Sequence, residues 1–301
     1  MTSTRIGFIG LGMMGSALAM RLASRAELTV YDLDPARAEP LVAAGGHAAS
    51  DIGAIAEADT IITCLPTSAD VKSALAALRS AGGPAPGALV IDCTSGDPSA
   101  TRAIAADLAL RGIDFADAPV SGGPQAAAAG TIAILVGADD QVFARAEPLL
   151  RLISSSVRHV GAVGSGHCVK LLNNALAAGQ RLLAFEALTV AVGQGVDPVA
   201  FVDAVNVSSG RSYATEVTLP RHLLGGELDQ GFSLGLAAKD VSLAVSLVPS
   251  PLVAQSIIAE VAGRTAAAAR QLGTSADVNR LIEIYEELSG TTVARSARSR
   301  R

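Results

Sequence analysis

One lysine and two asparagines, Lys170, Asn173 and Asn174, lie within a long apolar stretch of the chain. Residues three and four apart lie on one face of a helix, so these polar side chains would project together. Within the stretch 161–194, the Leu, Ala and Val residues that follow Gly166 predict a helix that is buried around most of its circumference. Burial disfavours a charged amine, so Lys170 needs a partner or a lowered pKa there. We therefore consider it a functional lysine; the alternative is a lysine that snorkels to the surface.

A glycine-rich segment near the N-terminus has the pattern of a dinucleotide site. An apolar strand pattern at 5–9 is followed by GxGxxG and then by helical spacing, which is the context that the fingerprint requires. Gly10 would permit the tight turn, Gly12 would let the backbone approach a pyrophosphate, and Gly15 would let the helix pack on the strand. The predicted cofactor-binding residues of this segment are Gly10, Leu11, Gly12, Met13, Met14 and Gly15.

Strand and helix patterns alternate through the first half of the chain. Apolar strand patterns at 28–31, 60–65 and 88–92 are separated by helical spacing, which predicts an α/β fold with a parallel, doubly wound Rossmann sheet. Ligands bind beyond the carboxyl ends of such strands. Asp32 ends the second strand, where an acid would accept hydrogen bonds from the ribose hydroxyls of NAD. Further cofactor contacts are expected at the later strand ends, at Leu65, Pro66, Thr94 and Ser95, where ordinary loops are the alternative.

A short polar turn follows the next apolar segment. Successive backbone N–H groups at Ser121, Gly122 and Gly123 could form a concavity that binds an anion, and the hydroxyl of Ser121 would add a donor. A substrate carboxylate would fit there. The alternative is a plain Gly-Pro turn, because Pro124 follows.

The second half of the chain is predicted to be helical. Lys239 is expected near the head of a helix over 236–247, where the helix dipole disfavours a cation, so a functional reason for this lysine is more plausible than solvation. Other helices are expected at 196–205, 252–272 and 277–288. The predicted organisation is a dinucleotide-binding domain over 1–163, an interdomain helix with an all-helical domain over 164–290, and a disordered tail over 291–301.

Composition restricts the classes of function. A net charge of −5 argues against non-specific binding of nucleic acid. The three cysteines, Cys64, Cys93 and Cys168, lack the spacing of a metal site and suggest reduced thiols in a cytoplasmic protein. No signal peptide is expected, and the polar residues in the long apolar helix argue against a transmembrane span.

Four motifs together resemble the β-hydroxyacid dehydrogenases, the family of 3-hydroxyisobutyrate dehydrogenase and tartronate semialdehyde reductase. They are Gly10–Gly15, Asp117–Thr131, Gly161–Asn174 and Lys239–Asp240. The resemblance implies that Lys170 is the catalytic lysine, and that Lys239 lies near the cofactor. It also implies a homodimer or homotetramer joined through the helical domain. It places Ser121, Gly122 and Asn174 at the substrate carboxylate, with Gly123 and Asn173 nearby.

The expected function is hydride transfer between NAD and a small carboxylate-bearing 3-hydroxy acid or its semialdehyde. Relatives that prefer NADP often carry Asn-Arg where this chain has Asp32 and Leu33, so NADP is less expected. Two alternatives share the scaffold: an imine reductase, which usually lacks the lysine, and a non-catalytic dinucleotide-binding protein, which would tolerate loss of the polar residues. Lys170 would act as an acid and base or as a permanent charge, and no metal ion is expected.

Overall fold

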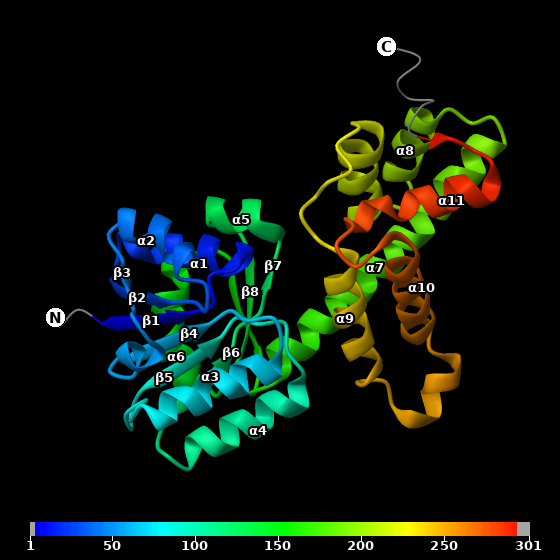
Figure 1. The fold of residues 1–301 in the computed structure, drawn as a ribbon. Coiled ribbons are helices and arrows are strands. Elements are labelled where there is room, and N and C mark those ends of the chain that lie inside the picture. Colours follow the sequence, from blue (N-terminus) through cyan, green and yellow to red (C-terminus); the bar gives the residue numbers. More distant parts are fainter. Residues whose placement is uncertain (1–3, 294–301) are drawn as a thin grey trace. The chain divides into compact units, whose positions relative to one another are not determined.

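The chain folds into two compact units, Met1–Lys170 and Leu171–Arg301. A computed structural model describes residues 4–293 (Figure 1). The boundary falls inside one long helix, after Lys170, whereas the sequence placed it after Val163. Most of the tail predicted to be disordered lies outside the described residues.

The first unit alternates strands with helices, as the sequence predicts. Its strands are β1 Arg5–Ile9, β2 Glu27–Tyr31, β3 His47–Ala48, β4 Thr60–Thr63, β5 Leu89–Asp92, β6 Asp114–Asp117, β7 Val120–Ser121, β8 Ala133–Gly137 and β9 Val157–Gly161. Its helices are α1 Met13–Ala23, α2 Glu39–Ala43, α3 Ser68–Ser80, α4 Pro98–Ala109, α5 Gly123–Ala129 and α6 Asp140–Ile153.

All nine strands form one sheet. Six of them run parallel in the order β3-β2-β1-β4-β5-β6. The sheet is not parallel throughout, because β8 runs antiparallel to both β6 and β7. Strand β7 continues β6 along the same side of β8, because Asp117 of β6 and Val120 of β7 pair with β8 in one antiparallel register. Helix α5 then connects β7 to β8, so the turn after Ser121 lies beyond the carboxyl end of β6.

Two apolar cores cover the two faces of this sheet. Successive side chains of a strand point to opposite faces. Accordingly, Phe8 and Ile91 join a core with α1 and α6, whereas Ile9 and Val90 join a core with α3 and α4. Figure 1 shows the corresponding layers, with α1 and α5 on one side of the sheet and α3 and α4 on the other. The fold is therefore the expected Rossmann sheet, wound on both faces.

The second unit is helical. It contains α7 Ser165–Gly193 from Leu171 onward, α8 Pro198–Asn206, a π-helical segment Ala214–Leu224, α9 Leu234–Val245, α10 Ile257–Leu272 and α11 Leu281–Ser289. One core joins these elements, and α7 contributes Leu171, Ala175, Ala178, Leu182, Phe185 and Leu188 to it. The spacing of three and four residues is that of a single buried helix face.

The prediction that α7 is buried around most of its circumference is wrong. Val169, Leu176, Leu183 and Val190 follow one another every seven residues and are 38–69% exposed. Helices of the second unit pack against the opposite face of α7, which leaves this apolar stripe uncovered in a single chain. Among the described residues, α7 alone is long and apolar enough to cross a membrane, a property that buried helices of soluble proteins share.

Two details of the helical unit differ from the sequence prediction. Lys239 does not lie at the head of its helix, because α9 begins at Leu234, with the hydroxyl of Ser233 accepting a hydrogen bond from Leu236 N–H. The argument from the helix dipole therefore does not apply to Lys239. The π-helical segment Ala214–Leu224 was not predicted; Pro220 lies inside it.

Candidate active site

The glycine turn between β1 and α1 has the shape that a dinucleotide requires. Gly10 adopts a φ of 97°, in the region that favours glycine. A Cβ on Gly15 would collide with the carbonyl of Gly10, so the close packing of helix on strand depends on this glycine. A Cβ on Gly12, by contrast, would meet nothing within 4 Å, which leaves the backbone open at the head of α1. These residues therefore fit a pyrophosphate above the helix N-terminus.

Asp32 lies beside this turn at the end of β2. One oxygen of its carboxylate accepts a hydrogen bond from Leu11 N–H at 2.6 Å, and the other accepts one from Asp34 N–H at 2.9 Å. The guanidinium of Arg37 lies 3.7 Å from the same carboxylate. Arg37 also lies 3.4 Å from the carboxylate of Asp34. Hydrogen bonds thus fix the carboxylate of Asp32 next to the glycine turn, and the guanidinium of Arg37 lies beside it.

The ends of β4 and β5 are tied to each other. The hydroxyl of Thr94 accepts a hydrogen bond from Leu65 N–H at 3.0 Å, and Thr94 is 1% exposed. Asp92 accepts hydrogen bonds from Thr63 Oγ1 and from Thr94 N–H. Pro66 directly follows Leu65, and Ser95 directly follows Thr94. The side chain of Thr94 therefore joins two loops, and a cofactor at this edge would meet the loops themselves.

The Ser121 turn connects β7 to α5. Ser121 ends the strand, and Gly122 and Gly123 adopt φ values of 139° and 77° at the start of the helix. Glycine adopts such positive φ values without steric cost, whereas other residues are strained by them. The turn therefore depends on both glycines, and the anion cradle at Ser121 stays a prediction.

Lys170 is the last residue of the first unit and is 8% exposed. It lies in the second turn of α7, whose first turn is held by a buried carboxylate. Asp117, at the end of β6, accepts hydrogen bonds from Gly164 N–H at 2.7 Å and from His167 N–H at 2.8 Å. Burial raises the pKa of Asp117, while His167 and the backbone donors act in the opposite direction. The same carboxylate thus anchors the helix that carries Lys170 and ends the strand that leads to Ser121.

The second unit fixes the amide of Asn174. Its Nδ2 donates to Asp240 Oδ2 at 2.7 Å, and Lys239 Nζ lies 3.1 Å from the other carboxylate oxygen. Asp240 is 3% exposed. Asn173 is exposed and donates a long hydrogen bond of 3.4 Å to Asn174 Oδ1. One hydrogen of the Asn174 amide is therefore committed to Asp240, and the other can serve a ligand.

The sequence prediction missed three buried residues. Asp117 and Asp240 appear in the motifs but were given no role, and His167 was not singled out. Their signal was the occurrence of polar residues within apolar segments. Their partners are distant in sequence, so only the fold could identify them. Within residues 4–293, no group of three His, Cys, Asp or Glu residues could hold a metal ion.

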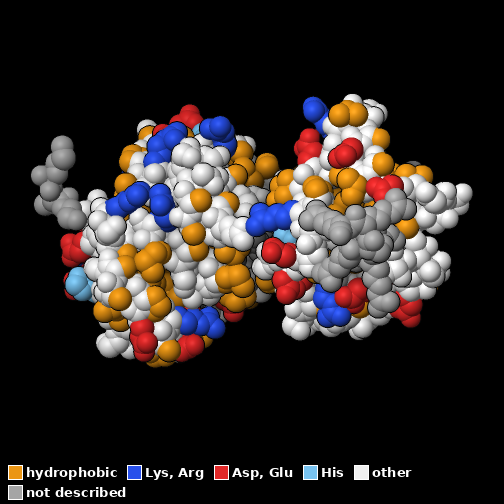
Figure 2. Space-filling view, turned by 90° about the horizontal axis from the view of Figure 1, so that it is seen from above, with side chains coloured by type: hydrophobic (Ala, Val, Ile, Leu, Met, Phe, Trp, Pro, Cys, Tyr) orange, Lys and Arg blue, Asp and Glu red, His pale blue; other side chains and the backbone are white. Residues whose placement is uncertain are grey.

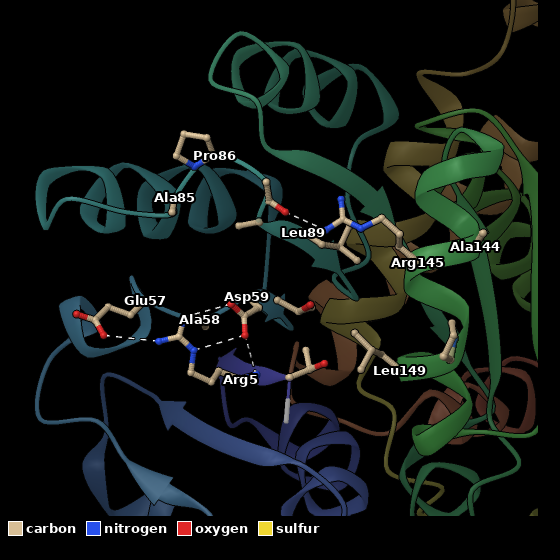
Figure 3. Close-up of a pocket in the computed structure, with 15 residues that line it drawn as sticks. Arg5, Glu57, Ala58, Asp59, Ala85, Pro86, Leu89, Ala144, Arg145 and Leu149 are labelled. Carbon is tan, nitrogen blue, oxygen red and sulfur yellow. Dashed lines mark hydrogen bonds and ion pairs between the residues drawn. The ribbon is translucent and has the colours of Figure 1, made fainter. Parts of the chain in front are cut away.

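A hollow of about 660 Å³ lies at the opposite, amino-terminal ends of the strands (Figure 3). Its charged side chains are paired: Arg5 with Asp59 and Glu57 of the same lining, and Arg145 with Asp114 outside it. None of the predicted site residues lines it. We therefore interpret it as an ion-paired surface and not as the active site.

Comparison with known proteins is consistent with this geometry. Residues 5–161 match the family described as the NAD binding domain of 6-phosphogluconate dehydrogenase. Residues 164–285 match the family described as NAD-binding of NADP-dependent 3-hydroxyisobutyrate dehydrogenase. The chain belongs to the β-hydroxyacid dehydrogenase family. It is an oxidoreductase of the hydroxy-acid dehydrogenase type that uses NAD or NADP.

Individual relatives align with most of the length of this chain. The chain is 35% identical to 2-(hydroxymethyl)glutarate dehydrogenase of Eubacterium barkeri, over 97% of this chain and 98% of that protein. It is 36% identical to mitochondrial 3-hydroxyisobutyrate dehydrogenase of Rattus norvegicus, over 81% of this chain and 75% of that protein. The solved structure of 3-hydroxyisobutyrate dehydrogenase of Mycobacterium tuberculosis with L-serine has a TM-score of 0.85 at 28% identity. The match covers 94% of this chain and 99% of that one. A reductive aminase of Aspergillus terreus is more distant, with a TM-score of 0.59 at 25% identity, covering 94% of this chain and 100% of that one.

Proposed function

We propose that this dehydrogenase transfers a hydride between NAD and a small 3-hydroxy acid of the 3-hydroxyisobutyrate kind. The observation that carries the proposal is the polar face of α7, on which Lys170, Asn173 and Asn174 share a continuous helix. The Asn174 amide on this face is held by the buried carboxylate of Asp240. These three polar side chains in an otherwise apolar helix support the proposal, because a small polar substrate that lies against them would form hydrogen bonds with them.

Each residue then has a role that its chemistry allows. A nicotinamide dinucleotide supplies the hydride chemistry when bound. Lys170 holds or moves the proton at the substrate oxygen, or stabilises negative charge there as a permanent ammonium. Ser121, Gly122 and Asn174 donate hydrogen bonds to the substrate carboxylate, a charge-assisted arrangement that fixes the reacting carbon.

The proposed cofactor is NAD and not NADP. The carboxylate of Asp32 would accept hydrogen bonds from ribose hydroxyls, but it would repel a 2′-phosphate. Arg37 reduces that repulsion without removing it, because it lies 3.7 Å from Asp32 and shares its charge with Asp34. We expect a preference for NAD of at least about tenfold in kcat/KM, or roughly 1.4 kcal/mol.

Steady-state kinetics with both cofactors tests the activity and the preference. The substrate panel contains 3-hydroxyisobutyrate, glycerate, 3-hydroxypropionate, 4-hydroxybutyrate, threonate and 3-hydroxybutyrate, with cyclic imines as the comparison. Reduction of imines without oxidation of any hydroxy acid would reject the proposal. In the variant Asp32→Asn with Leu33→Arg, the NAD preference should narrow or reverse through KM of the cofactor. An unchanged ratio would show that Asp32 is not at the ribose.

We further propose a cytoplasmic homo-oligomer that binds neither nucleic acid nor membrane. The exposed stripe Val169, Leu176, Leu183 and Val190 supports self-association, because exposed apolar surfaces of this kind usually mark interfaces. In Figure 2 the basic side chains form small separate groups between apolar and acidic ones on the face shown, which disfavours a polyanion partner there. Light scattering of Leu183→Glu should show a smaller species than the wild type. The control is Glu186→Gln, which changes another exposed residue of α7.

A further inference from the structure

His167 lies one turn before Lys170 on α7 and is completely buried. Its Nε2 lies 2.8 Å from the carbonyl oxygen of Thr94, which can only accept a hydrogen bond. Its Nδ1 lies 2.7 Å from the hydroxyl of Thr101 on α4. The ring therefore connects the first turn of α7 to the loop after β5 and to the helix that follows that loop.

Glycines and buried carboxylates surround the ring of His167 at short distances. A Cβ on Gly96 would lie 3.0 Å from the ring of His167, so the loop after β5 needs a glycine there. A Cβ on Gly166 would lie 2.8 Å from the carboxylate of Asp117. Two buried carboxylates face the ring, since Asp92 Oδ2 and Asp117 Oδ2 each lie 3.9 Å from a ring nitrogen.

The hydrogen bonds of this cluster restrict the position of α7. The carbonyl of Thr94 requires a proton on Nε2 of His167. The hydroxyl of Thr101 is also 2.9 Å from the carbonyl oxygen of Asp97. Its one proton goes to Nδ1 of a neutral ring, or it goes to that carbonyl when a doubly protonated ring donates from Nδ1 to the hydroxyl oxygen. In both arrangements every ring nitrogen has a partner, and a rotation of the helix would break two hydrogen bonds of buried groups. Such a rotation is unfavourable, because a buried polar group that loses its partner keeps the full cost of its desolvation.

We propose that His167 is a positioning residue of the hydride-transfer site, which sets the rotation of α7 and thereby the place of Lys170 relative to the cofactor loop at Thr94. This inference rests on the proposed function for its consequence in turnover. His167 itself does not need to touch substrate. A misplacement of about 1 Å can cost on the order of 10²-fold in rate, so a small rotation would suffice.

The variants are His167→Phe, which removes both ring hydrogen bonds, and His167→Gln, whose amide can still donate to the carbonyl of Thr94. His159→Phe is the matched control, because His159 also bonds a backbone carbonyl of the first unit, that of Ala138, but lies on β9. We expect His167→Phe to lower kcat by about 10- to 100-fold with little change in KM for the cofactor. His167→Gln should recover most of that loss, and His159→Phe should leave kcat unchanged.

A double-mutant cycle separates positioning from a general loss of stability. In a Lys170→Ala background, His167→Phe should have no further effect on kcat, because the group that it positions is absent. Effects that add, or a His167→Phe enzyme with wild-type kcat, would overturn the inference. If His167→Phe does not fold, Thr101→Val takes its place, since it removes one partner of the ring at similar volume.

A second measurement needs no turnover. The chain has three lysines, Lys72, Lys170 and Lys239, so acetylation at each site can be followed by mass spectrometry. The ratio of labelling at Lys170 to that at the exposed Lys72 should change in His167→Phe and stay at the wild-type value in His159→Phe. If no hydroxy acid is turned over, the proposed function fails while this ratio still tests His167. An unchanged ratio in a folded His167→Phe would reject the positioning role.

Discussion

Removing the carboxylate of Asp240 should weaken the proposed enzyme by releasing Asn174. The hydrogen bond from Asn174 to Asp240 is short, at 2.7 Å, it involves a charged acceptor, and it is buried. Such bonds contribute about 1.5–3 kcal/mol. With roughly 1.4 kcal/mol for each factor of ten, Asp240→Ala should lower kcat/KM for the hydroxy acid by about 10- to 150-fold. Asp240→Asn keeps an oxygen toward Asn174 and should lose less than about tenfold.

The assay is steady-state kinetics at saturating cofactor, with Asn174→Ala and the double variant completing a cycle. Lys239 also contacts Asp240, so any loss that Asp240→Ala still causes in the Asn174→Ala background measures that ion pair. Asp277→Asn is the control, because Asp277 is a buried acid of the same unit whose partners include the backbone N–H groups of Gln230 and Gly231. It should lower stability and leave kcat/KM unchanged. A coupling energy between Asp240 and Asn174 below about 0.5 kcal/mol would refute the reasoning.

Three further predictions follow from the same site. Lys170→Ala should lower kcat by about 10²–10⁴-fold while dinucleotide binding, measured by calorimetry, stays near the wild-type value; retention of more than about a tenth of kcat would exclude Lys170 as the proton-handling group. Ser121→Ala should cost about 1.5–3 kcal/mol in substrate binding, and a carboxamide analogue should be poor; equal turnover of acid and amide would contradict a carboxylate at Ser121. Burial raises the pKa of Asp117, so its contribution to stability is fully present below the unfolded value of 3.8 and is lost as pH rises through the raised folded value. Denaturant titrations should therefore show wild-type stability falling relative to Asp117→Asn across that window, and a constant difference would contradict the raised pKa.

The sequence by itself determined the dinucleotide half of the molecule. The steric demands of Gly10, Gly12 and Gly15 are local, because each concerns a turn and the helix next to it. The alternation of strand and helix patterns can be read along the chain as well, and it predicted the doubly wound sheet. It did not predict that β8 runs antiparallel. The common helix face of Lys170, Asn173 and Asn174 also depends only on their spacing.

Tertiary structure decided everything that depends on partners distant along the chain. Asp117 reaches the first turn of α7 across 50 residues, and Asn174 reaches Asp240 across 66. Spacing cannot predict such pairs, because their geometry depends on how strands and helices pack. The exposed stripe of α7 is a similar case, since the composition of this helix suggests burial around most of its circumference and only the packed helices show which face stays open. The position of Lys239 within α9 likewise depends on where the chain turns into the helix at Ser233, which a short apolar pattern does not fix.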